Sequence, residues 1–171
     1  MADIPVICFV AAKSGTGKTT FLEKLIKEMV NRGYELGVVK SDAHNFEIDV
    51  PGKDSWRFAQ AGAKATAIIG PDKYALIQKT DQKSDLEYVL PLIQDVDIIF
   101  VEGYKAANRP KIEIVRREMG TEIVSDLENL VAVVTDVKEL QVPVPLLDIN
   151  DCGEAADLIE DRFLSKKKDI N

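Results

Sequence analysis

CFVAAKSGTGKTT, residues 8–20, is an apolar run that opens into a glycine-containing turn. The turn fits the phosphate-binding pattern G-x-x-x-x-G-K-[ST] at its last three positions, which are Gly17, Lys18 and Thr19, while Ala12 stands where the pattern has its first glycine. Apolar residues then recur at helical spacing, so the stretch predicts a strand, a loop and a helix. This order favours a nucleoside triphosphate site over the alternative, a glycine turn with a purely structural role.

The residue types in this turn suit a triphosphate. Gly15 and Gly17 allow backbone N–H groups to turn inward around phosphate oxygens, and the following helix adds the positive end of its dipole. Lys18 is expected to contact the β- and γ-phosphates, and the Thr19 hydroxyl is expected to bind Mg²⁺.

Length and charge narrow the class of protein. With 171 residues, 46% of them hydrophobic, the chain is expected to form one nucleotide-binding domain over residues 1–171. A net charge of −7 argues against a general nucleic-acid surface, and no apolar stretch approaches the ~20 residues that cross a bilayer. Cys8 and Cys152 form no C-x-x-C pair, so neither a zinc site nor a disulfide is expected. We therefore expect a cytoplasmic protein without nucleic-acid or membrane binding, with residues 165–171 as a flexible tail.

Alternating strand and helix patterns predict the fold. Strand-like runs occupy residues 4–10, 36–40, 65–69, 74–78, 97–103, 111–115, 130–134 and 144–147. Helical patterns follow the phosphate-binding turn and also occupy about 53–61, 84–93 and 151–164. The short turn after residue 69 predicts an antiparallel edge hairpin, and the other strands predict a three-layer, doubly wound, mostly parallel α/β sheet of the P-loop NTPase type (SIMIBI-like).

Polar residues at strand ends are the next candidates for the site. Glu102 ends an apolar strand and is expected to hold Mg²⁺ or to orient an attacking water; the alternative is a surface glutamate. Asp42, after the second strand, is a candidate Mg²⁺ ligand, and His44 is expected to be an exposed loop residue with a phosphate contact still open. Asp136 ends another strand, where P-loop GTPases often bind guanine. No N-K-x-D motif is present, so these residues favour guanine over adenine only weakly.

Basic residues occur in or near the loops on the expected ligand side of this acidic chain. They offer a site for a second anionic ligand or an acidic partner, and the alternative is ordinary solubilising charge. These residues are Lys53, Arg57, Lys105, Arg109 and Lys111.

Several segments in the same order resemble the molybdopterin-guanine dinucleotide biosynthesis adaptor family, MobB. The matching segments are 11–20, 49–55, 61–63, 101–105, 110–112 and 146–151. The resemblance implies a homodimeric P-loop protein that binds GTP and Mg²⁺ and hydrolyses GTP weakly. It also implies a MobA-like guanylyltransferase as partner, with molybdopterin as a candidate second ligand. By this resemblance the nucleotide phosphates are bound by Gly15, Gly17, Lys18, Thr19 and Thr20, and Glu102 serves the Mg²⁺ side. Together with the residues expected from their positions alone, the predicted nucleotide-binding set is Ser14, Gly15, Thr16, Gly17, Lys18, Thr19, Thr20 and Asp136, the predicted catalytic residues are Lys18 and Glu102, and the predicted metal ligands are Thr19, Glu102 and Asp42.

Two departures from the family pattern affect these expectations. Many members have a histidine directly after the strand-ending lysine, whereas here Ser41 follows Lys40. Lys13 gives the loop a partial likeness to partitioning-type ATPases, in which an extra lysine reaches the nucleotide of the other subunit, but Ser14 breaks that motif.

The leading hypothesis from the sequence is a Mg²⁺-dependent GTP-binding adaptor with slow turnover. One alternative is a P-loop kinase that phosphorylates a metabolite bound near His44, Lys53 and Lys105. The other is a dimeric scaffold that binds nucleotide without turnover.

Overall fold

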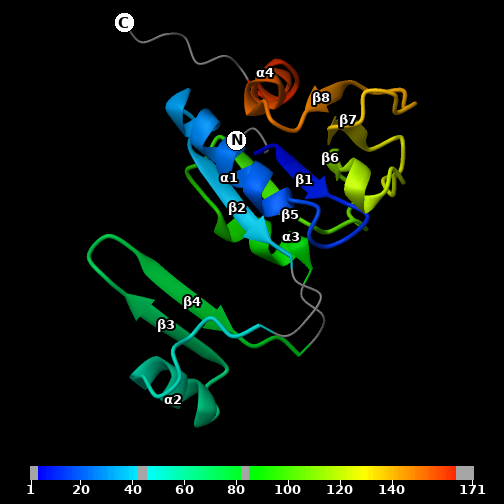
Figure 1. Ribbon diagram of the computed structural model, residues 1–171. Helices are drawn as coiled ribbons and strands as arrows, with labels where there is room; N and C mark the ends of the chain where they lie inside the picture. Colours follow the sequence, from blue (N-terminus) through cyan, green and yellow to red (C-terminus); the bar gives the residue numbers. More distant parts are fainter. Residues whose placement is uncertain (1–3, 42–45, 82–84, 165–171) are drawn as a thin grey trace, which may run out of the picture. The chain divides into compact units, whose positions relative to one another are not determined.

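A computed structural model describes residues 4–41, 46–81 and 85–164, which divide into two compact units (Figure 1). One unit comprises residues 1–41 and 93–171, and the other comprises residues 42–92. The predictions for Asp42, for His44 and for a tail at 165–171 lie outside the described residues, and the single domain expected from the length stays a prediction.

A six-stranded parallel sheet forms the first unit. Its strands lie in the order β2-β5-β1-β6-β7-β8, so that β1 is flanked by β5 and β6. Their bounds are Val6–Val10 for β1, Leu36–Lys40 for β2, Ile98–Glu102 for β5, Lys111–Val115 for β6, Leu130–Thr135 for β7 and Leu146–Asp148 for β8. Every residue of β1 is buried, as expected for a central strand covered on both faces. The mostly parallel α/β fold is confirmed.

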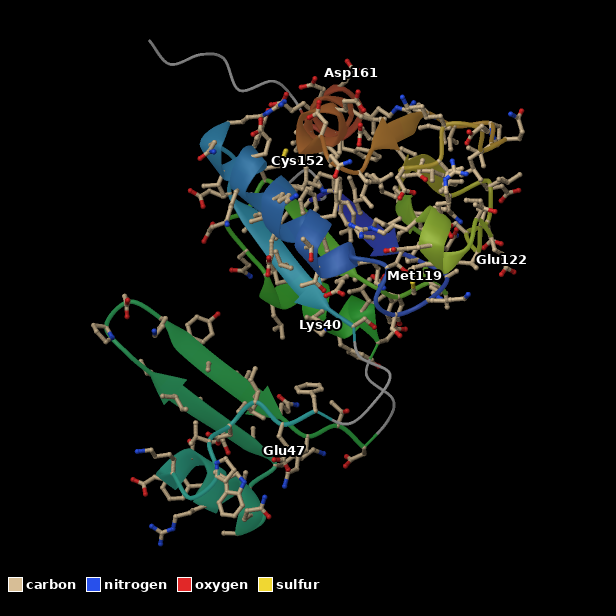
Figure 2. All side chains as sticks on the ribbon, viewed as in Figure 1. Lys40, Glu47, Met119, Glu122, Cys152 and Asp161 are labelled. Atoms are coloured by element: carbon tan, nitrogen blue, oxygen red, sulfur yellow. The ribbon has the colours of Figure 1, made fainter. Side chains whose placement is uncertain are left out.

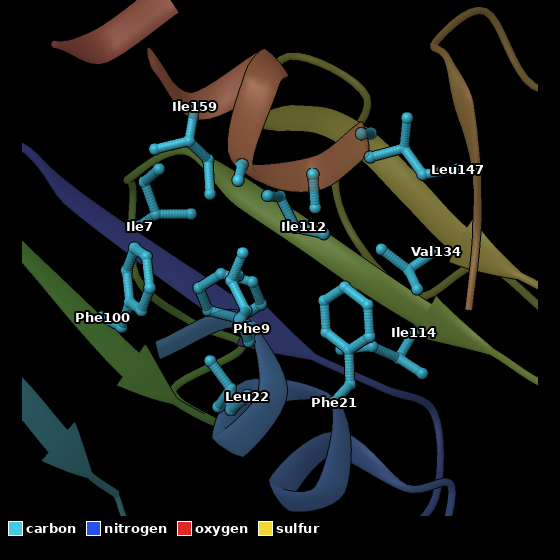
Figure 3. Close-up of a cluster of buried hydrophobic side chains, with 14 of the residues drawn as sticks. Ile7, Phe9, Phe21, Leu22, Phe100, Ile112, Ile114, Val134, Leu147 and Ile159 are labelled. Atoms are coloured by element: carbon cyan, nitrogen blue, oxygen red, sulfur yellow. The ribbon is translucent and has the colours of Figure 1, made fainter. Parts of the chain in front are cut away.

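Helices α1 (Lys18–Asn31) and α4 (Cys152–Phe163) pack together on one face of this sheet. Alternate strand residues point into their shared core, because side chains in a strand have a period of two. Figure 3 shows Phe9 of β1 and Phe100 of β5 in this core, with ring centroids 5.0 Å apart in an edge-to-face arrangement. Apolar residues of α1 fill the space beside these rings, which fixes the start of α1 above the end of β1.

An arginine at the C-terminal end of α1 joins the two helices. Arg32 Nε donates to Glu28 at 2.8 Å, and Arg32 Nη1 donates to Asp157 at 2.6 Å and to Glu160 at 2.7 Å. Burial alone would lower the pKa of the Arg32 guanidinium, but the bonds to these three carboxylates raise it. The guanidinium therefore stays charged and holds α1 against α4.

Connecting segments cover the opposite face of the sheet within the first unit. Val115, Leu130 and Val133 form a second buried cluster there, with apolar residues of the segments that follow β6 and β7 packed against it. Glu113 of β6 is fully buried, and its two carboxylate oxygens accept from the backbone N–H groups of Val124 and Ser125 at 2.9 Å each. A buried carboxylate thus pins the loop after β6 to the sheet.

Two side chains of this face bear on the sequence predictions. Lys111, which we expected among the loop cations, is a buried residue of β6, and its Nζ donates to the carbonyl of Ala107. Cys8 is fully buried, and burial raises the pKa of its thiol, while the positive charges of Lys111 and Arg109 act in the opposite direction.

The second unit consists of short elements. Helix α2 spans Asp54–Gln60, strand β3 spans Ala65–Ile69, β4 spans Tyr74–Gln78, helix α3 spans Leu86–Val89, and the 3₁₀ turn η1 spans Leu90–Leu92. Strands β3 and β4 form the predicted antiparallel hairpin, with Ile69 opposite Tyr74 and Ala67 opposite Leu76. These four residues share one face of the hairpin, because directly opposed residues point to the same side.

Differences from the predicted elements are short and local. The helix expected over 84–93 is a single α-helical turn followed by η1, because Pro91 has no N–H with which to continue the helical hydrogen bonds. The strand expected over 144–147 begins at Leu146. None of the helices in the described part of the chain has the length and apolar character needed to cross a membrane.

Candidate functional site

The predicted phosphate-binding turn is a strand–loop–helix unit in the structure. It connects the end of β1 at Val10 to the start of α1 at Lys18. Gly15 and Gly17 have φ angles of 77° and 94°, in the left-handed region that favours glycine. Thr16 is buried, and its hydroxyl donates to the carbonyl of Lys13 at 2.8 Å, which closes the loop on itself.

Ala12 replaces the first glycine of the pattern without backbone strain. Among the described residues other than glycine, only Asp95 and Tyr104 have positive φ angles. Ala12 therefore has a negative φ angle, which residues other than glycine adopt readily. Its carbonyl accepts from Lys105 Nζ at 2.9 Å. The loop therefore keeps its shape with alanine here, and Lys105 is fixed beside it.

Glu102, predicted to serve the metal, lies next to the start of α1. It ends β5 beside both β1 and β2, in register with Phe9 and Lys40. Glu102 Oε1 accepts from the Thr19 hydroxyl at 3.0 Å, and Glu102 Oε2 accepts from Lys40 Nζ at 3.2 Å. The Glu102 side chain is only 13% exposed, whereas that of Lys40 is 65% exposed. The Glu102 carboxylate is thus held in place by the Thr19 hydroxyl and by the Lys40 ammonium group. Because the Lys40 side chain is long and largely exposed, it can move away from Glu102.

This hydroxyl and carboxylate suit Mg²⁺, which prefers oxygen ligands. Mg²⁺ in nucleotide sites uses one or two carboxylates together with water and substrate phosphates rather than a cage of protein ligands. The described residues contain no group of three or more His, Cys, Asp or Glu side chains that could hold a metal by themselves. Thr19 and Glu102 would supply the protein side of such a site.

Three lysines, Lys18, Lys40 and Lys105, lie in or near the loop. Burial lowers the pKa of Lys18; the negative charge of Glu102 opposes this shift, and the positive charges of Lys105 and Lys40 add to it. An anion placed beside Lys18 would stabilise its charged form, which burial and the two neighbouring lysines disfavour. The loop, Lys18, Lys40 and Lys105 thus form a cationic surface suited to phosphate.

Asp136 lies away from Glu102 along the sheet, directly after β7. Its Oδ1 accepts from the backbone N–H of Arg117 at 2.9 Å, so that one oxygen holds the turn η2 (Arg117–Met119). Asp136 itself is exposed. The predicted role of Asp136 at a guanine base stays a prediction.

The sequence analysis did not single out Arg116, which lies against the loop. Its guanidinium is 3.4 Å from the position that a Cβ of Gly17 would occupy, and Met119 Cε is 3.9 Å from the corresponding position of Gly15. Figure 2 shows Met119 beside the loop that follows β1. The only signal in the sequence was that Arg116 follows a central strand directly.

The remaining predicted cations are distributed over both units. Lys53 precedes α2, and Arg57 forms an ion pair with Asp54 at 3.5 Å, both in the second unit. Lys13 is exposed, with its Nζ 3.9 Å from the position that a Cβ of Gly120 would occupy. Its action on the other subunit stays a prediction.

Comparison with known proteins assigns the chain to a family. Residues 6–136 match the model of the family described as MobB, molybdopterin guanine dinucleotide synthesis protein B. The chain belongs to this family. Among MobB relatives, it is 39% identical over 163 residues to the molybdopterin-guanine dinucleotide biosynthesis adapter protein of Escherichia coli K12, with 91% of each chain covered. It is 36% identical over 149 residues to the protein of the same name in Haemophilus influenzae, covering 86% of this chain and 83% of that protein.

Solved MobB structures share the fold. Bacillus subtilis MobB matches with a TM-score of 0.74 and 27% identity, over 95% of this chain and 99% of that chain. A MobB homologue from Bacillus stearothermophilus matches with a TM-score of 0.64 and 25% identity, over 92% of this chain and 97% of that one. The predicted family and fold class are therefore both confirmed.

The Glu102 carboxylate allows a direct test of the metal site. Glu102→Gln keeps the size of the side chain and an acceptor for Thr19 but removes the charge that attracts Mg²⁺. We expect the Mg²⁺ concentration that half-saturates GTP binding to rise about 10- to 100-fold, measured by calorimetric titration at a series of Mg²⁺ concentrations. Glu122→Gln, at an exposed position in the loop after β6, is the control. Equal Mg²⁺ dependence in the two variants would remove Glu102 from the metal site.

Proposed function

We propose that this MobB-family chain binds GTP and Mg²⁺ at the loop between β1 and α1 and acts as an adapter in molybdopterin guanine dinucleotide biosynthesis. The hydrogen bond between Thr19 and Glu102 is the observation that carries this proposal. It joins the hydroxyl of the phosphate-binding motif to a carboxylate 83 residues away, beside the cationic surface formed by the loop, Lys18, Lys40 and Lys105. An anionic nucleotide with a divalent cation matches this combination of charges.

Each residue has a defined role in this proposal. Lys18 neutralises the terminal phosphates, and the backbone N–H groups of the loop bind the phosphate oxygens. Thr19 and Glu102 hold Mg²⁺, which when bound offsets the charge that develops in phosphoryl transfer. The ion pair between Lys40 and Glu102 breaks when the metal binds, and the Lys40 ammonium group can then contact a phosphate oxygen.

Slow hydrolysis is part of the same proposal. Once Mg²⁺ replaces Lys40 beside Glu102, this carboxylate is engaged in holding the metal rather than in activating a water. Weak GTPase activity is then a consequence of a site built for binding. This arrangement suits a protein that presents nucleotide to a partner enzyme.

The partner in this proposal is a MobA-like guanylyltransferase that joins GTP to molybdopterin. Relatives of this chain carry the name adapter protein, which supports a role alongside another enzyme. Molybdopterin, which bears a phosphate, is the candidate second ligand. Lys105, which lies beside the loop in the first unit, could bind this phosphate.

Removing the loop lysine tests the nucleotide site. Lys18→Ala is expected to weaken GTP binding at least about 100-fold, because the phosphates lose their nearest cation. Lys24→Ala, at an exposed position of the same helix, is the matched control and is expected to bind GTP as the wild type does. Calorimetric titration gives both affinities. If Lys18→Ala keeps normal GTP affinity, the site assignment is wrong.

A homodimer formed through the second unit completes the proposal. On one face of the β3–β4 hairpin, Ile69 is 85% exposed, Tyr74 is 74% exposed and Leu76 is 51% exposed. An isolated two-stranded hairpin is marginally stable in water, so this apolar face needs a cover. A second copy of the chain offers an equally apolar face, and such self-complementary contacts are the usual basis of twofold dimers.

Charge placed on the hairpin tests the dimer. Leu76→Lys puts an ammonium group in the apolar face and is expected to raise the dimer dissociation constant about tenfold or more, because the charge must be desolvated on association. Ala75→Lys, on the opposite face of the same strand, is the control. Analytical ultracentrifugation over a range of protein concentrations measures both. A dimer that tolerates Leu76→Lys as well as Ala75→Lys would place the interface elsewhere.

A further inference from the structure

Arg116 lies flat against the phosphate-binding loop. It follows β6, the neighbour of β1 on the side away from β5. Three atoms of its guanidinium, Nε, Cζ and Nη2, are each 3.4 Å from the position that a Cβ of Gly17 would occupy. Equal distances from three coplanar atoms mean that the face of the guanidinium, rather than its edge, is turned toward Gly17.

The hydrogen-bonding edge of Arg116 is largely unused. Its Nε is buried and has no hydrogen-bond partner in the structure. Nη1 of Arg116 forms an ion pair with Glu118 Oε1 at 3.5 Å, and the Glu118 side chain is 72% exposed. A buried donor without an acceptor is unfavourable, so Arg116 gains from a ligand that offers two adjacent acceptors to Nε and Nη2.

In the proposed nucleotide site, Arg116 lies on the side of the loop toward which the nucleoside would extend. Thr19 and Glu102 lie on the β5 side of the loop, where the proposed function puts Mg²⁺ and the terminal phosphates. A nucleotide that runs across the loop from there carries its nucleoside toward the ends of β6 and β7. Arg116 follows the first of these strands and Asp136 follows the second.

The neighbouring charges favour a base over a phosphate at this end. Glu118 pairs with Arg116, and Asp136 accepts from the backbone of Arg117. Glu118 in η2 and Asp136 after β7 put two carboxylates near this turn, which repel a phosphate, whereas carboxylate oxygens accept from the N1 and N2 groups of guanine. Guanine also presents N7 and O6 as adjacent acceptors, which an arginine binds with two donors, while adenine presents an acceptor and a donor at the same edge.

We propose that Arg116 is the residue that selects guanine in this chain, donating from Nε and Nη2 to N7 and O6 of the base. This inference rests on the proposed GTP site and assigns its specificity to the turn after β6. The side chain leaves its position over Gly17 as the base binds, exchanging a donor without a partner for two hydrogen bonds.

The test compares GTP, ATP and 7-deaza-GTP, in which a C–H group replaces N7. The wild type is expected to bind GTP about 10- to 100-fold more tightly than either analogue. Arg116→Lys keeps the positive charge but loses the paired Nε and Nη2 donors. Arg116→Gln loses both the paired donors and the charge. Both variants are expected to lose about 10- to 100-fold in GTP affinity, less in affinity for 7-deaza-GTP, which keeps only the O6 acceptor, and less than about threefold in ATP affinity.

Arg117→Lys is the matched control, because the Arg117 guanidinium pairs with Glu139 and not with the loop. It is expected to keep the preference for GTP. Calorimetric titration gives the affinities, and thermal unfolding without nucleotide reports whether each variant is folded. If Arg116→Gln fails to fold, Arg116→Lys decides the result.

Three outcomes would overturn the inference. Equal losses for GTP, ATP and 7-deaza-GTP in the Arg116 variants would assign Arg116 to the phosphates. Unchanged affinities for all three nucleotides would reduce Arg116 to a packing residue. A wild type that binds no nucleotide would contradict the proposed function together with this inference, whereas the first two outcomes leave that function standing.

Discussion

The complete burial of β1 between β5 and β6 is the constraint on which the candidate site depends. A parallel strand covered on both faces has no freedom to shift, and its end fixes where the chain must turn into α1. Phe9 packs on Phe100 one strand away, and in the same register Glu102 comes to lie beside Phe9. Glu102, at the end of β5, and Arg116, directly after β6, therefore approach the loop and the start of α1 from two sides.

Glu102 shows how the site balances its charges. Thr19 and Lys40 satisfy both carboxylate oxygens when no metal is bound, so that a poorly exposed negative charge is not left unpaired. The exposed end of Lys40 costs little to move, because an ion pair with one solvated partner contributes little stability. The same contacts that stabilise the fold without nucleotide can thus be exchanged for contacts with a metal and a phosphate.

Local patterns in the sequence predicted most of the sheet. Strands such as Leu36–Lys40, Ala65–Ile69 and Lys111–Val115 agree with their predicted ranges, since apolar runs and turn residues mark their ends. Thr19 and Glu102 were both predicted as Mg²⁺ ligands, and the structure joins them by a hydrogen bond, while their role at a metal stays a prediction. The helix expected to reach residue 93 was too long, since the effect of Pro91 was not taken into account.

Contacts across the sheet were the part that the sequence could not supply. The approach of Arg116 to Gly17 depends on β6 lying next to β1, and no local sequence pattern predicts that strand order. The pairing of Lys40 with Glu102 depends in the same way on β2 lying next to β5. Lys111 was grouped with the cations near the loops because of its charge, although it also begins a predicted strand. In the structure it is buried in β6, where the carbonyl of Ala107 accepts a hydrogen bond from its Nζ.

The central claim is that the loop between β1 and α1 binds GTP together with Mg²⁺. Calorimetric titration of the wild-type protein with GTP and with ATP, each in the presence of Mg²⁺ and of a chelator, tests this claim most directly. GTP is expected to bind more tightly than ATP, and Mg²⁺ is expected to strengthen GTP binding. A preference for ATP, or GTP binding that does not respond to Mg²⁺, would contradict it.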